Sequence, residues 1–239
     1  MVFISEHLPS PCVQSLHRLG YETIPLPSDP RLSQPVSSHP DMLLFLSHHN
    51  LICDRFYYDM YAQKQIDYVC RTRNLTLKLT DEPPQKTYPH DIRFNTCSIG
   101  KYLFCHPLYT SPAILQTADI NMQTIVPVHQ GYARCSTCPV GDHALITADP
   151  SIHQAALKQN DLDVLSVHQG HIELPGYPYG FLGGSCGAIE NQLFFCGSLS
   201  HHPDGNAIRE FCEKHSIHII ELSSQPLYDG GSMIFIHQS

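Results

Sequence analysis

The segments VPVHQGYARC (126–135) and LSVHQGHIEL (165–174) share the tetrapeptide VHQG at a spacing of 39 residues. Repetition at a fixed spacing indicates a fold built from similar units. Around the second copy, residues 149–162 are predicted to form a helix, with Asp149 as its cap and Pro150 at its first position. A strand (163–169) and a hairpin that reverses at Glu190-Asn191 follow. The repeating unit is therefore helix, strand, hairpin.

The same order recurs four more times along the chain. The other predicted helices cover 10–20, 55–72, 111–120 and 205–216, and their strands 21–26, 75–80, 123–130 and 217–223. Hairpins follow at 41–54, 91–107 (turning at Gly100) and 132–149, whereas the last unit has only the strand 231–236. The apolar strand MVFIS (1–5) can supply its missing partner. Pairing of the two ends would close a ring of five units without exposed strand edges. The alternative is an open α/β sheet.

The length and composition indicate one domain (1–239). The chain has 14 Lys+Arg against 22 Asp+Glu and no basic run, which argues against nucleic acid. No apolar stretch approaches the roughly 20 residues that span a bilayer, so we expect a cytoplasmic protein without a membrane partner. The ten cysteines are scattered and predicted to be free thiols. Cys135 and Cys138 lack a second pair at zinc-ligand spacing, so neither a metal nor a cofactor is expected. The oligomeric state is left open.

Five such units closed by the N-terminal strand resemble the pentein, or guanidino-group-modifying, superfamily. It includes arginine and agmatine deiminases, dimethylarginine hydrolase, amidinotransferases and a non-enzymatic translation factor. The resemblance covers essentially the whole chain and implies a five-fold pseudosymmetric α/β propeller of ββαβ units. Its motifs are similar to those of a bacterial subfamily of this fold without an assigned function: YPHDIRFN (88–95), GYARCSTCPV (131–140), GYPYGFLGG (176–184) and PLYDGGSMIFI (226–236).

The superfamily's enzymes use a Cys to attack the guanidinium carbon, a His as acid and base, and carboxylates to orient the cation. In the second unit, Asp91 stands where deiminases carry the Asp of an Arg-Asp motif, although His90 replaces the Arg here. Asn95 in the same motif is a further binding candidate. Asp41 in HPDM (39–42) occupies a similar place in the first unit. The resemblance thus implies Asp41, Asp91 and Asn95 as ligand-binding residues.

In the fourth unit, GHIE (170–173) is similar to the GHVD of agmatine deiminases. This match would make His171 the acid/base and Glu173 a guanidinium-binding carboxylate. An alignment of the hairpins back from their turns instead pairs GYARC (131–135) with GFLGG (180–184). Phe181 would then begin the inner strand, and residues 171–179 would be an inserted loop, a possible lid. Both alignments remain open at this point.

In the fifth unit, the deiminase motif GGGNIHC aligned with DGGSMIF (229–235) puts Phe235 at the nucleophile position. Asp229 and the backbone of Gly230 and Gly231 are still expected to contact a ligand. Cys186 is the alternative nucleophile, because flanking glycines allow close approach. Cys135 and Cys138 are its rivals. The sequence predicts a C–N hydrolase or amidinotransferase-like enzyme for a guanidine- or amidine-like ligand, and the alternative is a non-catalytic binding or scaffold protein.

Overall fold

The computed structural model describes residues 1–237, which form five three-stranded sheets and one two-stranded sheet. In each three-stranded sheet the central strand pairs antiparallel with one neighbour and parallel with the other. Within each sheet the strands pair in the following order. The first sheet consists of β17 (Ile234–Phe235), β1 (Val2–Ser5) and β2 (Thr23–Leu26), and the second of β3 (Leu44–Ser47), β4 (Asn50–Asp54) and β5 (Thr76–Thr80). The other three consist of β6 (Cys97–Ile99), β7 (Tyr102–Cys105) and β8 (Thr124–Pro127); of β9 (Thr137–Val140), β10 (Ala144–Thr147) and β11 (Asp163–Ser166); and of β13 (Cys186–Ile189), β14 (Gln192–Phe195) and β15 (His218–Glu221).

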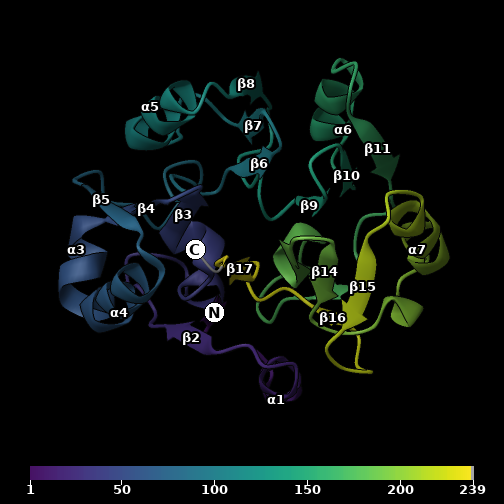
Figure 1. The fold of residues 1–239 in the computed structure, drawn as a ribbon, viewed down its shortest axis with the longest axis horizontal. Coiled ribbons are helices and arrows are strands. Elements are labelled where there is room, and N and C mark those ends of the chain that lie inside the picture. The colour runs from purple at the N-terminus through teal and green to yellow at the C-terminus, as the bar shows by residue number, and fades with distance from the viewer. Residues whose placement is uncertain (238–239) are drawn as a thin grey trace.

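A helical segment joins the central strand to the third strand in each of these sheets. These segments are α1 (Ser10–Arg18), α3 (Arg55–Tyr57) with the π-helical η2 (Tyr58–Ala62) and α4 (Gln63–Arg73), α5 (Pro112–Ile120), α6 (Pro150–Leu157) and α7 (Gly205–Lys214). They lie at the periphery of the molecule, whereas β17 and the two chain ends lie near its middle (Figure 1). No helix in the described part of the chain is both long and apolar enough to cross a membrane.

The two ends of the chain pair with each other as predicted. Val2 is opposite Phe235 and Phe3 is opposite Ile234 in an antiparallel ladder. The backbone N–H of Ile236 also donates to the carbonyl of Met1 at 3.0 Å. Residues Val2, Phe3 and Ile4 are almost completely buried. The N-terminal strand therefore completes the sheet of the last unit.

Each of the two VHQG copies contacts the aspartate that precedes the helix of the next unit. Asp149 caps α6 by accepting from the backbone N–H groups of Ser151 and Ile152. The Gln130 side chain donates to the same carboxylate at 2.9 Å. In the following unit, the backbone N–H of His168 donates to Asp204, which precedes α7. Both copies therefore connect neighbouring units, the first through the Gln130 side chain and the second through His168.

The inner strands are shorter than predicted, because the residues before them turn toward the neighbouring unit. The segments around Asp91, Cys135 and Gly184 were each expected to be extended. Instead β6, β9 and β13 begin only at Cys97, Thr137 and Cys186. Gly184 donates its N–H to the Cys135 carbonyl at 2.9 Å, a bond between two units that a longer hairpin would lose.

One further expectation about the first units was wrong, and one predicted helix is present but irregular. Asp41 was placed at the start of a strand, but it lies in the single helical turn α2 (Pro40–Leu43), which begins at a proline. The helix expected over residues 55–72 is divided by the π-helical stretch η2. Asn74, in a left-handed conformation, then ends α4.

Residues 171–179 lie outside the repeated hairpins. Ile172 and Glu173 form β12, which pairs in parallel with β16 (Leu227–Tyr228) as an additional two-stranded sheet. The inner strand of the fourth unit is β13. The structure therefore has the second of the two alignments, in which Phe181 rather than His171 corresponds to Tyr132.

Candidate functional site

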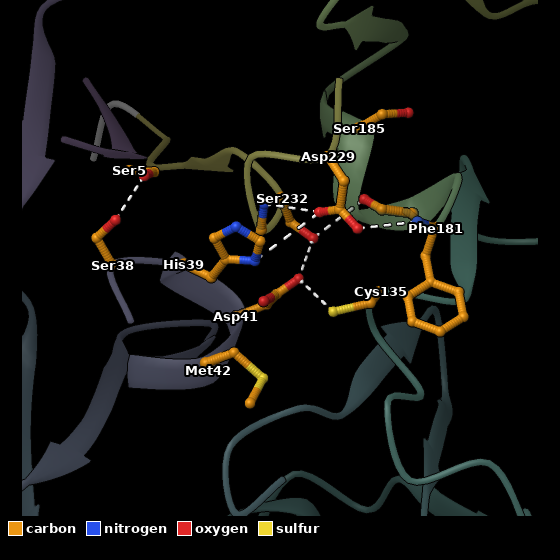
Figure 2. A network of polar contacts seen from close by, with 12 residues as sticks. Ser5, Ser38, His39, Asp41, Met42, Cys135, Phe181, Ser185, Asp229 and Ser232 are labelled. Carbon is orange, nitrogen blue, oxygen red and sulfur yellow. Dashed lines mark hydrogen bonds and ion pairs between the residues drawn. The ribbon is translucent and has the colours of Figure 1, made fainter. Parts of the chain in front are cut away.

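A buried polar cluster lies where the first, third and fifth units meet (Figure 2). We call His39, Asp41, Cys135, Asp229 and Ser232 the central cluster; each of these residues is at most 5% exposed. Asp41 Oδ2 accepts from the Ser232 hydroxyl at 2.6 Å and from the Cys135 thiol at 3.1 Å. His39 Nδ1 lies 3.9 Å from Asp229 Oδ1. Two carboxyl groups, a thiol and an imidazole therefore share one enclosed site.

Backbone groups hold the carboxyl groups in place. Asp229 Oδ2 accepts from the N–H of Phe181 at 2.8 Å, and Oδ1 accepts from the N–H of Gly231 at 3.0 Å. The N–H of Asp41 donates to the carbonyl of Gly231 at 3.0 Å. Gly231 has φ +74°, and a Cβ atom there would lie 2.1 Å from His39 Cβ. The glycine in the predicted DGGS segment is required for this close approach.

Burial changes the acid–base behaviour of the central cluster. It raises the pKa of Asp229 to about 6, although the hydrogen bonds from Phe181 and Gly231 oppose it. Burial also raises the pKa of Asp41, and His39 opposes this shift. The pKa of His39 is lowered to about 4, mainly by burial. The charged forms are disfavoured because the enclosed site cannot hydrate them.

One carboxylate oxygen in the central cluster has no partner. Asp41 Oδ1 is buried and makes no hydrogen bond within residues 1–237. Buried carboxylate oxygens normally accept hydrogen bonds, and an unsatisfied one is destabilising. A ligand carrying N–H donors would satisfy this oxygen.

Asp91 forms a second carboxyl site beside an aromatic rim. Its Oδ2 accepts from the Tyr132 hydroxyl at 2.6 Å, whereas Oδ1 has no partner within the described residues. The Tyr132 ring lies 5.5 Å from that of Tyr88 and 6.0 Å from that of Phe181, measured between centroids. Burial raises the pKa of Asp91, and the bond from Tyr132 opposes the shift. Asp91 is thus linked through Tyr132 to Phe181, whose backbone binds Asp229.

The inserted loop reaches the first unit. A Cβ atom at Gly176 would lie 2.8 Å from Pro35 Cγ, so the loop contacts η1 (Gln34–Val36). Residues 175–179 are exposed, and the loop ends at Gly180, which packs against the Asp229 side chain. The loop from Pro175 to Gly180 therefore runs from the Pro35 contact to the edge of the central cluster.

His171 and Glu173 lie apart from the central cluster. Both are exposed and line an open groove of about 620 Å³ together with Tyr177, Tyr179 and His201. The His171 ring packs edge to face against that of His202, at 5.9 Å between centroids. Only the backbone carbonyl of Glu173 reaches toward the cluster, where it accepts from the Asp229 N–H at 2.9 Å.

Cys186 is enclosed in a different environment. It is fully buried, and its thiol donates to the Gly183 carbonyl at 3.3 Å. Burial raises the pKa of Cys186, but a hydrogen bond from Cys138 and the positive charge of Arg134 reverse this shift and lower the pKa. No hydrogen bond joins Cys186 to His171 within residues 1–237. The predicted Cys186–His171 pair is therefore not assembled in this structure.

Some of the remaining predicted residues belong to or touch the central cluster, and others are engaged elsewhere. Asp41, Asp229 and Gly231 belong to or touch the central cluster, and Asn95 Nδ2 lies 3.0 Å from Cys135 Sγ. The Gly230 N–H donates to the Gly184 carbonyl at 3.1 Å rather than being free for a ligand. Phe235 packs in an aromatic group, 5.1 Å from the Tyr21 ring and 4.6 Å from the Phe194 ring.

The sequence interpretation named His39 beside Asp41 but gave it no role in the site, and it missed Ser232. His39 is the first residue of the quoted segment HPDM (39–42), and Ser232 directly follows Gly231. Their proximity to already selected residues was a usable signal, but it gave no reason to prefer them over other neighbours. Within the described residues, no three His, Cys, Asp or Glu side chains are placed to hold a metal ion.

Solved structures with the same arrangement of elements are guanidino-group-modifying enzymes. Dimethylarginine dimethylaminohydrolase from Pseudomonas aeruginosa, in a variant complexed with citrulline, has a TM-score of 0.57 at 10% identity, over 93% of this chain and 91% of that one. The amidinotransferase SxtG of the saxitoxin pathway, from Microseira wollei, has a TM-score of 0.61 at 9% identity, over 99% and 94%. The chain therefore has the mixed α/β fold of the penteins.

The family of the chain follows from its sequence. Residues 3–234 match a family of unknown function, DUF6873, and the chain belongs to this family. No curated protein matches the sequence.

Proposed function

We propose that the five units form a five-bladed propeller whose axis holds a binding site for a small guanidinium- or amidinium-type cation. The observation that carries this proposal is the unpartnered Oδ1 of Asp41, buried close to a second carboxyl group, Asp229. A planar cation with several N–H donors would satisfy this oxygen and make ionisation of both carboxyl groups favourable. A variant of the hydrolase with the similar fold is complexed with citrulline, and the other similar structure is an amidinotransferase, which supports the same ligand class here.

The reaction class that suits this site is hydrolysis or group transfer at a C–N bond. Carboxylates that orient the cation, a thiol within their reach and enclosure from water are the elements such a reaction needs. The loop from Pro175 to Gly180 contacts Pro35 at one end and Asp229 at the other, which supports ligand entry beside this loop. Asp91, joined to the rim through Tyr132, is placed to bind a further polar group of the ligand.

A second candidate function is binding without chemistry. Two observations favour it: Phe235 fills the expected nucleophile position, and Cys186 is fully buried away from His171. The non-enzymatic members of the superfamily show that this fold can serve as a binding protein.

Matched cations and neutral isosteres test the binding proposal. Acetamidinium and acetamide have nearly the same shape but differ in charge, as do methylguanidinium and methylurea. At neutral pH and constant ionic strength we expect the cations to raise the melting temperature and the neutral compounds to leave it unchanged. At 100 times Kd the stabilisation would be about 2.7 kcal/mol.

Asp229→Asn should abolish the shift, whereas Asp119→Asn, at an exposed position on α5, should keep it. Equal shifts for acetamidinium and acetamide in the unmodified protein would refute the proposal even if Asp229→Asn did not fold. Release of ammonia or an amine from the bound cation separates the enzyme from the binding protein.

A further inference from the structure

The Cys135 thiol forms hydrogen bonds with two side chains, Asp41 and Asn95. Its Sγ is 3.1 Å from Asp41 Oδ2, to which it donates, and 3.0 Å from Asn95 Nδ2, from which it accepts. Asn95 is fixed in turn, because its Oδ1 accepts from the N–H groups of Arg134 and Cys135 at 2.8 and 3.2 Å. The thiol therefore has a proton acceptor on one side and a rigid N–H donor on the other.

The other oxygen of the same carboxyl group is buried without a hydrogen-bond partner among residues 1–237. Asp41 is 1% exposed, and its Oδ1 has no partner among residues 1–237, whereas Oδ2 is bonded to Cys135 and Ser232. The Asp41 carboxyl group would thus contact a bound cation through Oδ1 and the Cys135 sulfur through Oδ2. This geometry is independent of the thiol's own contacts and indicates a ligand beside it.

We propose that Cys135 is the attacking thiol of this protein, with Asp41 as its proton acceptor, in place of the nucleophile expected at the position of Phe235. The proposal rests on the cation site proposed above. It moves the nucleophile from the fifth unit to the third. The attacking group then comes from the segment before β9, which faces Asp41 and Asp229 across the central cluster.

The first step conserves atoms and charge. The Cys135 S–H proton passes to Asp41, and the thiolate forms a C–S bond with the central carbon of the amidinium or guanidinium group. The C=N electron pair moves onto nitrogen and gives a tetrahedral adduct. Its collapse breaks the C–N bond to the leaving amine, which takes the proton back from Asp41. The products are ammonia or a neutral amine and a cationic group on the sulfur, a thioimidate from an amidinium or an isothiouronium from a guanidinium, which water or an acceptor amine then removes.

A bound cation would be needed to activate this thiol. Burial, followed by the negative charges of Asp41 and Asp229, raises the pKa of Cys135 well above its ordinary value. A positive charge placed between these carboxylates would offset their effect and favour the thiolate. Cys135 should therefore react with cationic electrophiles and resist neutral ones.

Cys186 does not meet the same conditions. Its sulfur is bonded to the Gly183 carbonyl, and it packs in an apolar cluster that includes Cys138, Leu193 and Phe195. Neither Asp41 nor Asp229 forms a hydrogen bond with it within the described residues. A cation bound by these carboxylates would face Cys135 instead.

Two alkylating agents that differ only in charge test the proposal. 2-Chloroacetamidine is cationic and 2-chloroacetamide is its neutral isostere; both transfer their carbon to sulfur and release chloride. The rate at each cysteine is measured by peptide mass mapping. The ratio of the two rates at Cys135 is compared with the ratio at Cys70, the one cysteine in the described chain that is not fully buried. We expect the ratio at Cys135 to be at least about tenfold larger, since a bound cation is held where the sulfur lies.

Cys135→Ala should remove this labelling but keep the melting shift caused by acetamidinium. Preferential modification of Cys186, or equal ratios at Cys135 and Cys70, would overturn the proposal for Cys135. If the acetamidinium shift persists in that case, the cation site stands and only the choice of thiol is wrong. If the shift is absent as well, the proposed function itself is wrong.

Discussion

Asp229 lies where the inserted loop, the fifth unit and the first unit meet. Its carboxyl group accepts from Phe181 and Gly231, and its backbone N–H donates to Glu173. Despite these bonds, burial raises its pKa to about 6, while the pKa of the adjacent His39 is lowered to about 4. The folded protein therefore disfavours the charged forms of both residues, because burial removes them from water.

Asp229 and His39 should contribute to the pH dependence of the free energy of unfolding with opposite signs. In the unfolded chain Asp titrates near 3.9, so between about pH 4 and 6 the folded state binds more protons at Asp229 and loses stability as pH rises. Asp229→Asn removes this loss, so relative to the unmodified protein it should gain up to about 3 kcal/mol between pH 4 and 7. Denaturant unfolding at several pH values measures the difference.

His39→Gln serves as the comparison for this experiment. The unfolded state binds more protons at His39 between about pH 4 and 6.5, so the unmodified protein loses stability as pH falls. His39→Gln should therefore gain relative stability toward low pH. Parallel curves for all three proteins would contradict the assigned pKa directions.

At the scale of elements, the segment from Asp229 to Ser232 is shaped by close backbone contacts. Gly231 touches His39 in the first unit, and Ser232, with φ +65°, directs its hydroxyl to Asp41. A Cβ atom at Gly184 would lie 2.0 Å from Asp229 Oδ1, so the backbone of the fourth unit also packs closely against this side chain. Small residues in these segments allow the carboxyl groups to be buried together.

Gly231→Ala should be strongly destabilising compared with Gly20→Ala. Both glycines have positive φ, at +74° and +85°, so both substitutions carry the left-handed strain of about 1–2 kcal/mol. Only at Gly231 would the new Cβ meet other atoms, whereas nothing lies within 4 Å at Gly20. Overpacking typically adds about 1–3 kcal/mol, so we expect a total near 3 kcal/mol at Gly231. Equal losses in urea unfolding would show that the contact with His39 is unimportant.

The sequence was sufficient to predict those helix ends and turns that are determined by neighbouring residues. Asp149 followed by Pro150 predicted the start of α6, and the reversals at Gly100 and Glu190-Asn191 are present in the structure. The extent of the inner strands was not predictable, because the bond between Gly184 and Cys135 depends on how two units pack. Apolar alternation alone cannot distinguish a strand from a turn that packs against a neighbour.

The candidate site was predictable only in part, for the same reason. Asp41 and Asp229 were selected from motifs, yet the bond between Asp41 and Ser232 joins residues 191 positions apart. His171 was selected from a motif as well, but β12 pairs with β16 and leaves the His171 side chain in the exposed groove. Motifs identified residues with suitable chemistry, whereas packing between units decided which of them meet.

At the scale of the whole molecule, the pairing of β1 with β17 connects the first unit to the last. His39 and Asp41 come from one side of this connection, and Asp229 and Ser232 come from the other. The central cluster can therefore form only when the two ends of the chain are held together. The backbone bond from Ile236 to Met1 and the buried side chains of β1 supply this attachment.

A circular permutant tests whether the connection depends on structure rather than on chain order. Linking the two ends through a short Gly/Ser segment and opening the chain between Gln159 and Asn160, in an exposed loop after α6, should preserve cooperative unfolding. Deletion of residues 1–5 should instead cost about 5 kcal/mol or more, because Val2, Phe3 and Ile4 each contribute roughly 1.5–3 kcal/mol when buried. Such a loss is comparable to the whole stability of many domains. Circular dichroism and urea unfolding distinguish the outcomes: a permutant that fails to fold, or a deletion that unfolds at the same urea concentration as the intact chain, would support the open sheet over a fold closed through β1.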